Sequence, residues 1–132
     1  MDNYNLWYGI FNLLDFNSQL AIISISKNFR SNLYITNLCD FYDKYSRKLN
    51  ETLLRRDIFE FVSKIKIIAL KKNPIWNISF LQNLKVLQAQ SSSGITQNDI
   101  RNLDLTELDA NNNSEINDVS FMKNLKVLRA RG

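Results

Sequence analysis

Residues 79–87, SFLQNLKVL, return 41 positions later as residues 120–128, SFMKNLKVL. Between these two copies, residues 105–110 (LTELDA) repeat the end of the pattern and divide the interval into steps of 21 and 20 residues. An earlier copy, residues 65–70 (IKIIAL), begins 19 residues before Leu84. Because a period of about 20–50 residues is the signature of repeat proteins, the chain is predicted to stack short, similar units.

The units share one spacing of apolar and polar positions. If the first apolar residue of a unit is position 1, a second apolar residue stands at position 4 and a third, or Ala, at position 6. Asn or Ser follows at position 9, and Ile at position 11 or 12. This spacing resembles the leucine-rich repeat over roughly half of the chain. The resemblance implies an α+β fold, an α/β solenoid with a parallel sheet, in which residues 63–132 form three full units plus the strand of a fourth. The anchors are Ile65, Ile68, Leu70, Asn73 and Ile75; Leu84, Leu87, Ala89, Ser92 and Ile95; Leu105, Leu108, Ala110, Asn113 and Ile116; and Leu125, Leu128 and Ala130.

Alternation along each strand assigns its residues to two faces. Leu87 and Ala89 are predicted to point inward, and Val86 and Gln88 outward. The Asn anchors, with Ser92 as a weaker substitute, are expected to satisfy backbone groups where the chain leaves the strand. A second apolar set is predicted to pack behind the strands: Ile78, Phe80, Leu81, Ile100, Leu103, Val119, Phe121 and Met122.

The outward positions are predicted to form three rows that bind a protein partner. The middle row is the best candidate for an apolar contact stripe, although β-branched residues also simply favour strands. The rows are Lys66, Lys85, Thr106 and Lys126; Ile67, Val86, Glu107 and Val127; and Ala69, Gln88, Asp109 and Arg129.

The last strand is followed at once by Gly132. An open end would leave unpaired strand groups and apolar anchors in water, so homo-oligomerisation through residues 125–131 is expected. The alternative is that Lys126, Arg129 and Arg131 shield this edge.

Residues 1–62 are predicted to form a helical cap, because the periodicity before Ile65 is that of short helices. Four helices are predicted, over residues 6–14, 20–33, 39–45 and 52–62, with Asp15 and Asn17-Ser18 at the first break.

Residues 10–15 (IFNLLD) and 25–33 (ISKNFRSNL) are similar to the F-box motif, in which Leu-Asp ends an apolar helix and Val-Cys-Lys-x-Trp-Arg-x-Leu follows. Lys27, Arg30 and Leu33 match the motif, and Phe29 stands at its Trp position. The resemblance implies that these helices dock a Skp-type adaptor. The residues implied in adaptor binding are Ile10, Leu13, Leu14, Leu20, Lys27 and Phe29.

The totals exclude several classes of function. With no histidine and one cysteine in 132 residues, Ser-His-Asp and Cys-His catalysis, histidine-bearing metal sites and an intrachain disulfide are all impossible. Three glycines provide no phosphate-binding loop, so no enzyme activity and no cofactor are expected. The excess of 17 Lys and Arg over 13 Asp and Glu is scattered, so nucleic acid is not an expected partner. No apolar run of about 18 residues exists to span a bilayer, and a cytoplasmic location is expected.

The sequence therefore predicts a protein–protein interaction scaffold. The F-box-like start followed by leucine-rich repeats resembles substrate receptors of cullin-type ubiquitin ligases, and the layout resembles proteins encoded by large DNA viruses of protists, which implies the host cytoplasm. The alternative is a binding or self-assembling repeat module without a ligase role.

Overall fold

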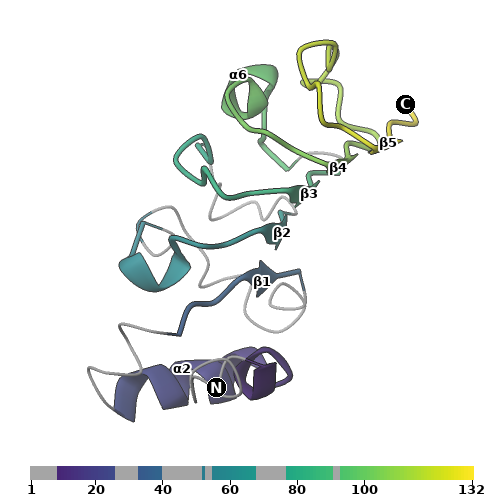
Figure 1. Cartoon of the computed structure of the whole chain (residues 1–132). Helices are drawn as coiled ribbons and strands as arrows, with labels where there is room; N and C mark the ends of the chain where they lie inside the picture. Colours follow the sequence, from purple (N-terminus) through teal and green to yellow (C-terminus); the bar gives the residue numbers. More distant parts are fainter. Residues whose placement is uncertain (1–8, 26–32, 40–51, 53–54, 68–76, 91–92) are drawn as a thin grey trace.

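The computed structural model describes residues 9–25, 33–39, 52, 55–67, 77–90 and 93–132. Their main feature is a parallel sheet of five strands in the order β1-β2-β3-β4-β5, which is also their order in the chain (Figure 1). The elements are the α-helix α2 (Phe16–Ile25), β1 (Asn37–Leu38), the 3-10 helix η1 (Asp57–Phe59), β2 (Lys64–Lys66), β3 (Val86–Gln88), the α-helix α6 (Gln97–Ile100), β4 (Glu107–Asp109) and β5 (Val127–Arg129).

Each strand is short, and the central residues of the four three-residue strands, β2 to β5, are aligned with one another. Ile65 of β2 pairs with Leu87, which pairs with Leu108, which pairs with Leu128. The described segments that lead into β2, β3, β4 and β5 all lie on the same side of the sheet and return the chain to the start of the next strand (Figure 1). We call one strand with its return segment a unit. The predicted α+β class and parallel sheet are confirmed.

The pairing of β2 corrects the predicted alignment of the first unit. Ile65 was expected beside Leu84, but it pairs with Leu87. Residues 62, 65 and 67 have the same apolar spacing as residues 65, 68 and 70, so the run of isoleucines fits two registers. The observed register begins three residues earlier and places Val62 and Ile67 in the core.

β1 was not predicted, since residues 1–62 were expected to be helical. Its residues Asn37 and Leu38 pair in parallel with Lys64 and Ile65, and Leu38 is fully buried. The spacing of Ile35 and Leu38 matches the first two anchors of a unit, which explains why this short segment joins the sheet.

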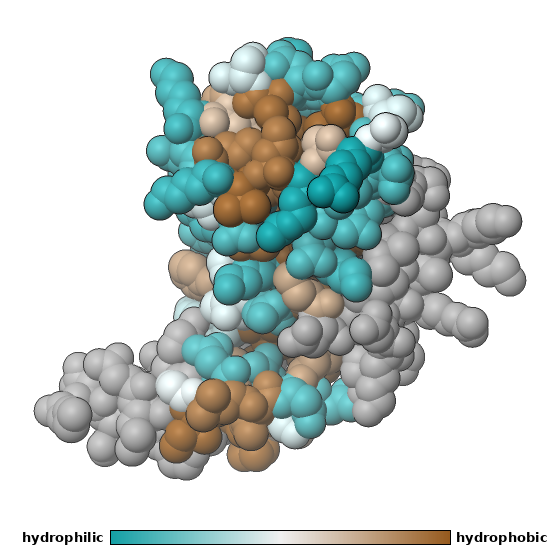
Figure 2. Space-filling model, turned by 90° about the vertical axis from the view of Figure 1, so that its right-hand side faces the viewer, coloured by the Kyte–Doolittle hydropathy of each residue, from teal (hydrophilic) through white to brown (hydrophobic). Residues whose placement is uncertain are grey.

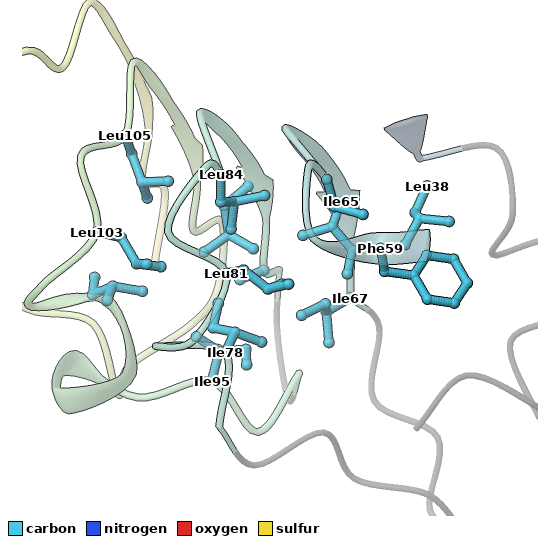
Figure 3. Close-up of a cluster of buried hydrophobic side chains, with 14 of the residues drawn as sticks. Leu38, Phe59, Ile65, Ile67, Ile78, Leu81, Leu84, Ile95, Leu103 and Leu105 are labelled. Atoms are coloured by element: carbon cyan, nitrogen blue, oxygen red, sulfur yellow. The ribbon is translucent and has the colours of Figure 1, made fainter. Parts of the chain in front are cut away.

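The core lies between the sheet and the return segments (Figure 3). The strands contribute Ile65, Leu87 and Leu108, all fully buried. The second apolar set packs against them as predicted: Ile78, Leu81, Ile100, Leu103 and Met122 are buried, and Phe80, Val119 and Phe121 are partly buried. Burial of a Leu or Ile side chain contributes about 1.5–3 kcal/mol, so this shared layer is the main source of stability.

Asn113 confirms the predicted structural role of the Asn anchors. Its amide nitrogen donates to the carbonyl oxygens of Ala89 (2.9 Å) and Ile95 (3.1 Å), and its Oδ1 accepts from the backbone N–H of Glu115 (3.1 Å). Buried Ser93 takes the corresponding position one unit earlier and accepts from the N–H of Ile95 (3.4 Å). The predicted anchors Asn73 and Ser92 lie outside the described residues.

The N-terminal helical segments lie at the β1 end of the sheet (Figure 1). Residues 9–12 are helical, and the Asp15 carboxylate accepts from the N–H of Ser18 (2.9 Å), so the predicted break at Asp15 is present. α2 begins at Phe16, four residues before the helix predicted over residues 20–33, and it includes Asn17 and Ser18, which were expected in the break. Leu33, the predicted end of that helix, is not helical. Phe11 and Ile23 join the core. Of the predicted helices over 39–45 and 52–62, most of the first lies outside the described residues, and the described helical parts of the second are residue 52 and η1.

Two truncations at the same register position test this layer. Leu108→Ala should lower the free energy of unfolding by about 2–5 kcal/mol, because it opens a cavity in the core. Leu128→Ala is the matched control, and since Leu128 is 46% exposed it should cost about 1 kcal/mol or less. Urea denaturation of both variants measures the difference, and equal losses would contradict the observed burial.

Candidate binding surface

The outward residues of β2 to β5, together with the residue that precedes each of these strands, form a surface that we call the outer sheet face. Its middle is mostly hydrophilic, and hydrophobic residues reach the surface at both ends of the stack (Figure 2). The parallel pairing of the strands places equivalent residues of neighbouring strands side by side, which arranges the face in three rows. The rows are Ser63, Lys85, Thr106 and Lys126; Lys64, Val86, Glu107 and Val127; and Lys66, Gln88, Asp109 and Arg129.

The rows are as predicted for β3, β4 and β5 but not for β2. Lys66 lies beside Gln88 and not beside Lys85, because of the three-residue shift in register. Ile67 was expected to face outward beside Val86, and this expectation is wrong. Its N–H donates to the Gln88 carbonyl (2.7 Å), and its side chain is only 2% exposed. The predicted apolar stripe is therefore reduced to Val86 and Val127, which Glu107 separates.

Lys64 takes the place that had been assigned to Ile67. Lys64 is exposed, and it was not among the predicted site residues because the predicted unit began three residues too late. The spacing of Val62, Ile65 and Ile67 was the signal that could have located it.

Some charged residues of the face are already engaged within the chain. Asp109 is only 8% exposed, and its carboxylate accepts from the Gln90 side-chain amide (2.7 Å) and the N–H of Asn111 (3.2 Å). Lys85 forms a salt bridge with Asp104. Glu107 has no such partner among the described residues, so it is the carboxylate of this face that is left to solvent.

Asp104 joins three consecutive units at one side of the sheet. Its carboxylate accepts from the Lys85 ammonium of the preceding unit (2.7 Å) and from the Asn124 amide of the following unit (2.7 Å). The hydrogen bond from Lys85, followed by the one from Asn124, holds the pKa of the Asp104 carboxyl below its ordinary value of 3.8. These contacts connect three neighbouring units and so stabilise the order in which their strands are stacked.

A second candidate surface is the free edge of β5, which ends the described sheet. Leu128 is exposed, whereas its register partner Leu108 is fully buried. Beside the end of this strand lies an open groove of about 460 Å³, lined by Ala110, Asn112, Asn113, Ser114, Ile116, Asn117, Ala130, Arg131 and Gly132.

A third candidate surface lies on the N-terminal helices. Of the residues implied in adaptor binding, Ile10 and Leu13 are exposed, Leu13 at 86%, while Leu14 and Leu20 are partly buried. Ile25 at the end of α2 is also exposed. Lys27 and Phe29 lie outside the described residues.

The remaining features of the described chain are less specific. A cavity of about 450 Å³ beside η1 contains the Arg55 guanidinium 4.1 Å from the centre of the Phe80 ring. In the part of the chain that the structure describes, no three Cys, Asp or Glu side chains are grouped closely enough to hold a metal ion. Likewise, none of the described helices has the length and apolar character needed to cross a membrane.

The Asp104 contacts predict a pH dependence of stability. Folding lowers the pKa of Asp104, so its ionised carboxylate stabilises the folded chain fully at pH values above the ordinary pKa of 3.8. This stabilisation is lost as the pH falls through the lowered pKa of the folded chain. Lys85→Met should therefore raise the pKa of Asp104, measured by NMR titration of its side-chain carbon. Lys126→Met, which removes a cation that does not contact Asp104, is the control, and an equal shift in both variants would contradict the assigned cause.

No protein-family model matches the chain, and comparisons with curated proteins and with solved structures find no match.

Proposed function

We propose that this chain is a protein–protein interaction scaffold built as a short solenoid of the leucine-rich-repeat type. The observation that carries the proposal is the register. Residues Ile65, Leu87, Leu108 and Leu128 recur at intervals of about 20 residues and pair in sequence order. A unit with a three-residue strand cannot close its own core, so stacking of neighbours is required, as in repeat proteins.

The outer sheet face supports a binding role. Glu107 lies between Val86 and Val127 in one row, and Lys64 and Lys66 on β2 and Arg129 on β5 flank it. This face combines two half-buried valines with charged side chains, and a transient protein interface as a whole has a similar mixture of apolar and polar area. A partner with an apolar side chain next to a basic one would match this centre, because Glu107 needs a cation when it is desolvated.

Charge reversal at the centre tests this role. Glu107→Lys should strongly reduce capture of partner proteins by the immobilised chain from native cell extract, measured by quantitative mass spectrometry. Glu115→Lys is the matched control, since Glu115 is exposed on a return segment away from the outer sheet face. Equal capture by the wild type and both variants would reject the outer sheet face as the binding surface.

A more specific candidate function is that of a substrate receptor for a cullin-type ubiquitin ligase. The observation that favours it is the exposure of Ile10, Leu13 and Ile25 on the N-terminal helices, where the F-box resemblance implies adaptor contacts. In this proposal residues 1–62 hold the adaptor and the sheet holds the substrate. The alternative is a binding module without a ligase role.

A purified Skp-type adaptor distinguishes these alternatives. The wild-type chain should bind it in a pull-down, and Leu13→Asp should abolish binding because a charge would enter an apolar contact. Leu128→Asp makes the same change at an exposed leucine of the opposite end and should leave adaptor binding intact. Failure of the wild-type chain to bind the adaptor would reject the ligase role without affecting the scaffold proposal.

A further inference from the structure

The three middle strands of the sheet differ in the charge that they carry on the outer sheet face. β2 carries Lys64 and Lys66, β3 carries Val86 and Gln88, and β4 carries Glu107. Each of these strands is hydrogen-bonded to a strand on both sides, so their arrangement does not depend on either edge of the sheet. The face therefore changes from cationic through neutral to anionic over three neighbouring strands.

These side chains are not engaged elsewhere in the described chain. Neither of the two β2 lysines nor Glu107 forms a salt bridge or a side-chain hydrogen bond with another described residue, and the side-chain amide of Gln88 has no hydrogen-bond partner among them. Lys85 and Asp109, in contrast, are held by contacts within the chain. The charges on β2 to β4 that no described contact neutralises are thus two ammonium groups and one carboxylate.

The sheet is curved, and the outer sheet face lies on the inner side of the curve. Figure 1 shows that the return segments fan out more widely than the strands. A solenoid that curves in this way has a concave surface suited to an elongated ligand. Because the middle of this face is mostly hydrophilic (Figure 2), charge and hydrogen bonding would select the ligand more than apolar burial would.

We propose that the outer sheet face binds an extended segment of a partner protein in which an acidic and a basic residue stand three positions apart. This inference deepens the proposed scaffold function and rests on it. The acidic side chain would pair with Lys64 and Lys66, and the basic side chain with Glu107. The residues between them would cross Val86, and the Gln88 amide would donate to a backbone carbonyl of the segment. Opposite charges at the two ends of the contact would fix the orientation of the segment.

The distance between the strands selects the conformation of this segment. β2 and β4 are two strand spacings apart, which is about 9.6 Å. A polyproline II helix rises about 3.1 Å per residue with three residues per turn, so every third residue lies on one side at intervals of about 9.3 Å. In a β-strand the residues of one side are about 6.8 Å apart, which is too short, or about 13.6 Å apart, which is too long. A polyproline II helix also leaves its carbonyl groups free to accept from Gln88.

Two other occupants fit this face less well. An α-helix uses its backbone carbonyl groups internally and docks through several apolar anchors, whereas Val86 is the apolar outward residue that β2 to β4 offer. A second copy of the chain could place its β4 over β2, but two concave faces would meet at their rims and leave Val86 uncovered. An extended segment satisfies the charge, the hydrogen bonding and the curvature.

A peptide that carries Glu-Pro-Pro-Arg between Gly-Ser ends is the direct probe, because its prolines favour the polyproline II conformation. NMR titration of the isotope-labelled 132-residue chain should show saturable shifts of the Val86 and Glu107 backbone amides and of the Gln88 side-chain amide. A peptide with Glu-Pro-Arg, which shortens the spacing to about 6.2 Å, should bind about tenfold more weakly or worse. Equal affinity of the two peptides would show charge attraction without recognition of spacing and would overturn the proposal.

Charge reversal in the protein, combined with exchange of the peptide, locates the two contacts. Glu107→Lys should weaken binding of Glu-Pro-Pro-Arg by about tenfold or more, and this variant should bind Glu-Pro-Pro-Glu more tightly than the wild-type chain does. Lys64→Glu with Lys66→Glu should likewise lose Glu-Pro-Pro-Arg and gain Arg-Pro-Pro-Arg. Gain of the matched peptide also demonstrates that each variant is folded, and loss of one peptide without gain of the other would contradict the assigned contacts.

Matched controls make the same changes of net charge away from the outer sheet face. They are Glu115→Lys, and Arg101→Glu with Lys123→Glu, at exposed positions of the return segments. Both should leave the affinity for Glu-Pro-Pro-Arg within about twofold. Equal effects of the controls and the face variants would mean that net charge alone governs binding. Dimerisation of the wild-type chain that Glu107→Lys abolishes in sedimentation velocity would assign the face to a second copy.

Failure of this inference can be distinguished from failure of the scaffold proposal. If none of the peptides binds but Glu107→Lys still reduces capture of proteins from cell extract, the face binds a partner of another kind and only this inference is overturned. If Glu107→Lys leaves capture unchanged as well, the outer sheet face is rejected as the binding surface.

Discussion

The fold depends on burial of one aligned column of aliphatic side chains. Ile65, Leu87 and Leu108 lie beside one another in the sheet, and each is fully buried only because the next unit covers it. A three-residue strand gains too little apolar contact on its own to offset the entropy of ordering its unit. The register of the sheet, the rows of its outer face and the positions of the return segments all follow from keeping this column continuous.

Polar contacts between units add specificity to this apolar layer. Asn113 uses its buried amide to connect the turn after β4 with the backbone of the preceding unit, and Asp104 connects side chains from three units at the surface. The buried amide would be costly to leave unpaired, whereas the exposed carboxylate is screened by water and salt. Asn113 therefore restricts which residue can occupy its position, while Asp104 mainly modulates stability with pH.

The sequence predicted the parallel sheet, the inward leucines and the outer rows of three strands, because the copies at residues 84–89, 105–110 and 125–130 have unambiguous spacing. It did not locate β2 or predict β1. In the run from Val62 to Leu70 two registers satisfy the same apolar spacing, and only packing against β3 selects between them. β1 has two residues, too few for a periodic signal, and its place depends on contact with β2. The error moved Ile67 onto the candidate site and left Lys64 out of it.

The two edges of the described sheet differ in how well their apolar residues are covered. Leu38 at one edge is covered by neighbouring segments, whereas Leu128 at the other has a neighbour on one side only. In a one-dimensional stack each unit is held by its neighbours, so a strand added beside β5 would bury Leu128 and slow the local opening of β5. Such a strand, whether it came from this chain or from another, would lengthen the ordered part of the stack.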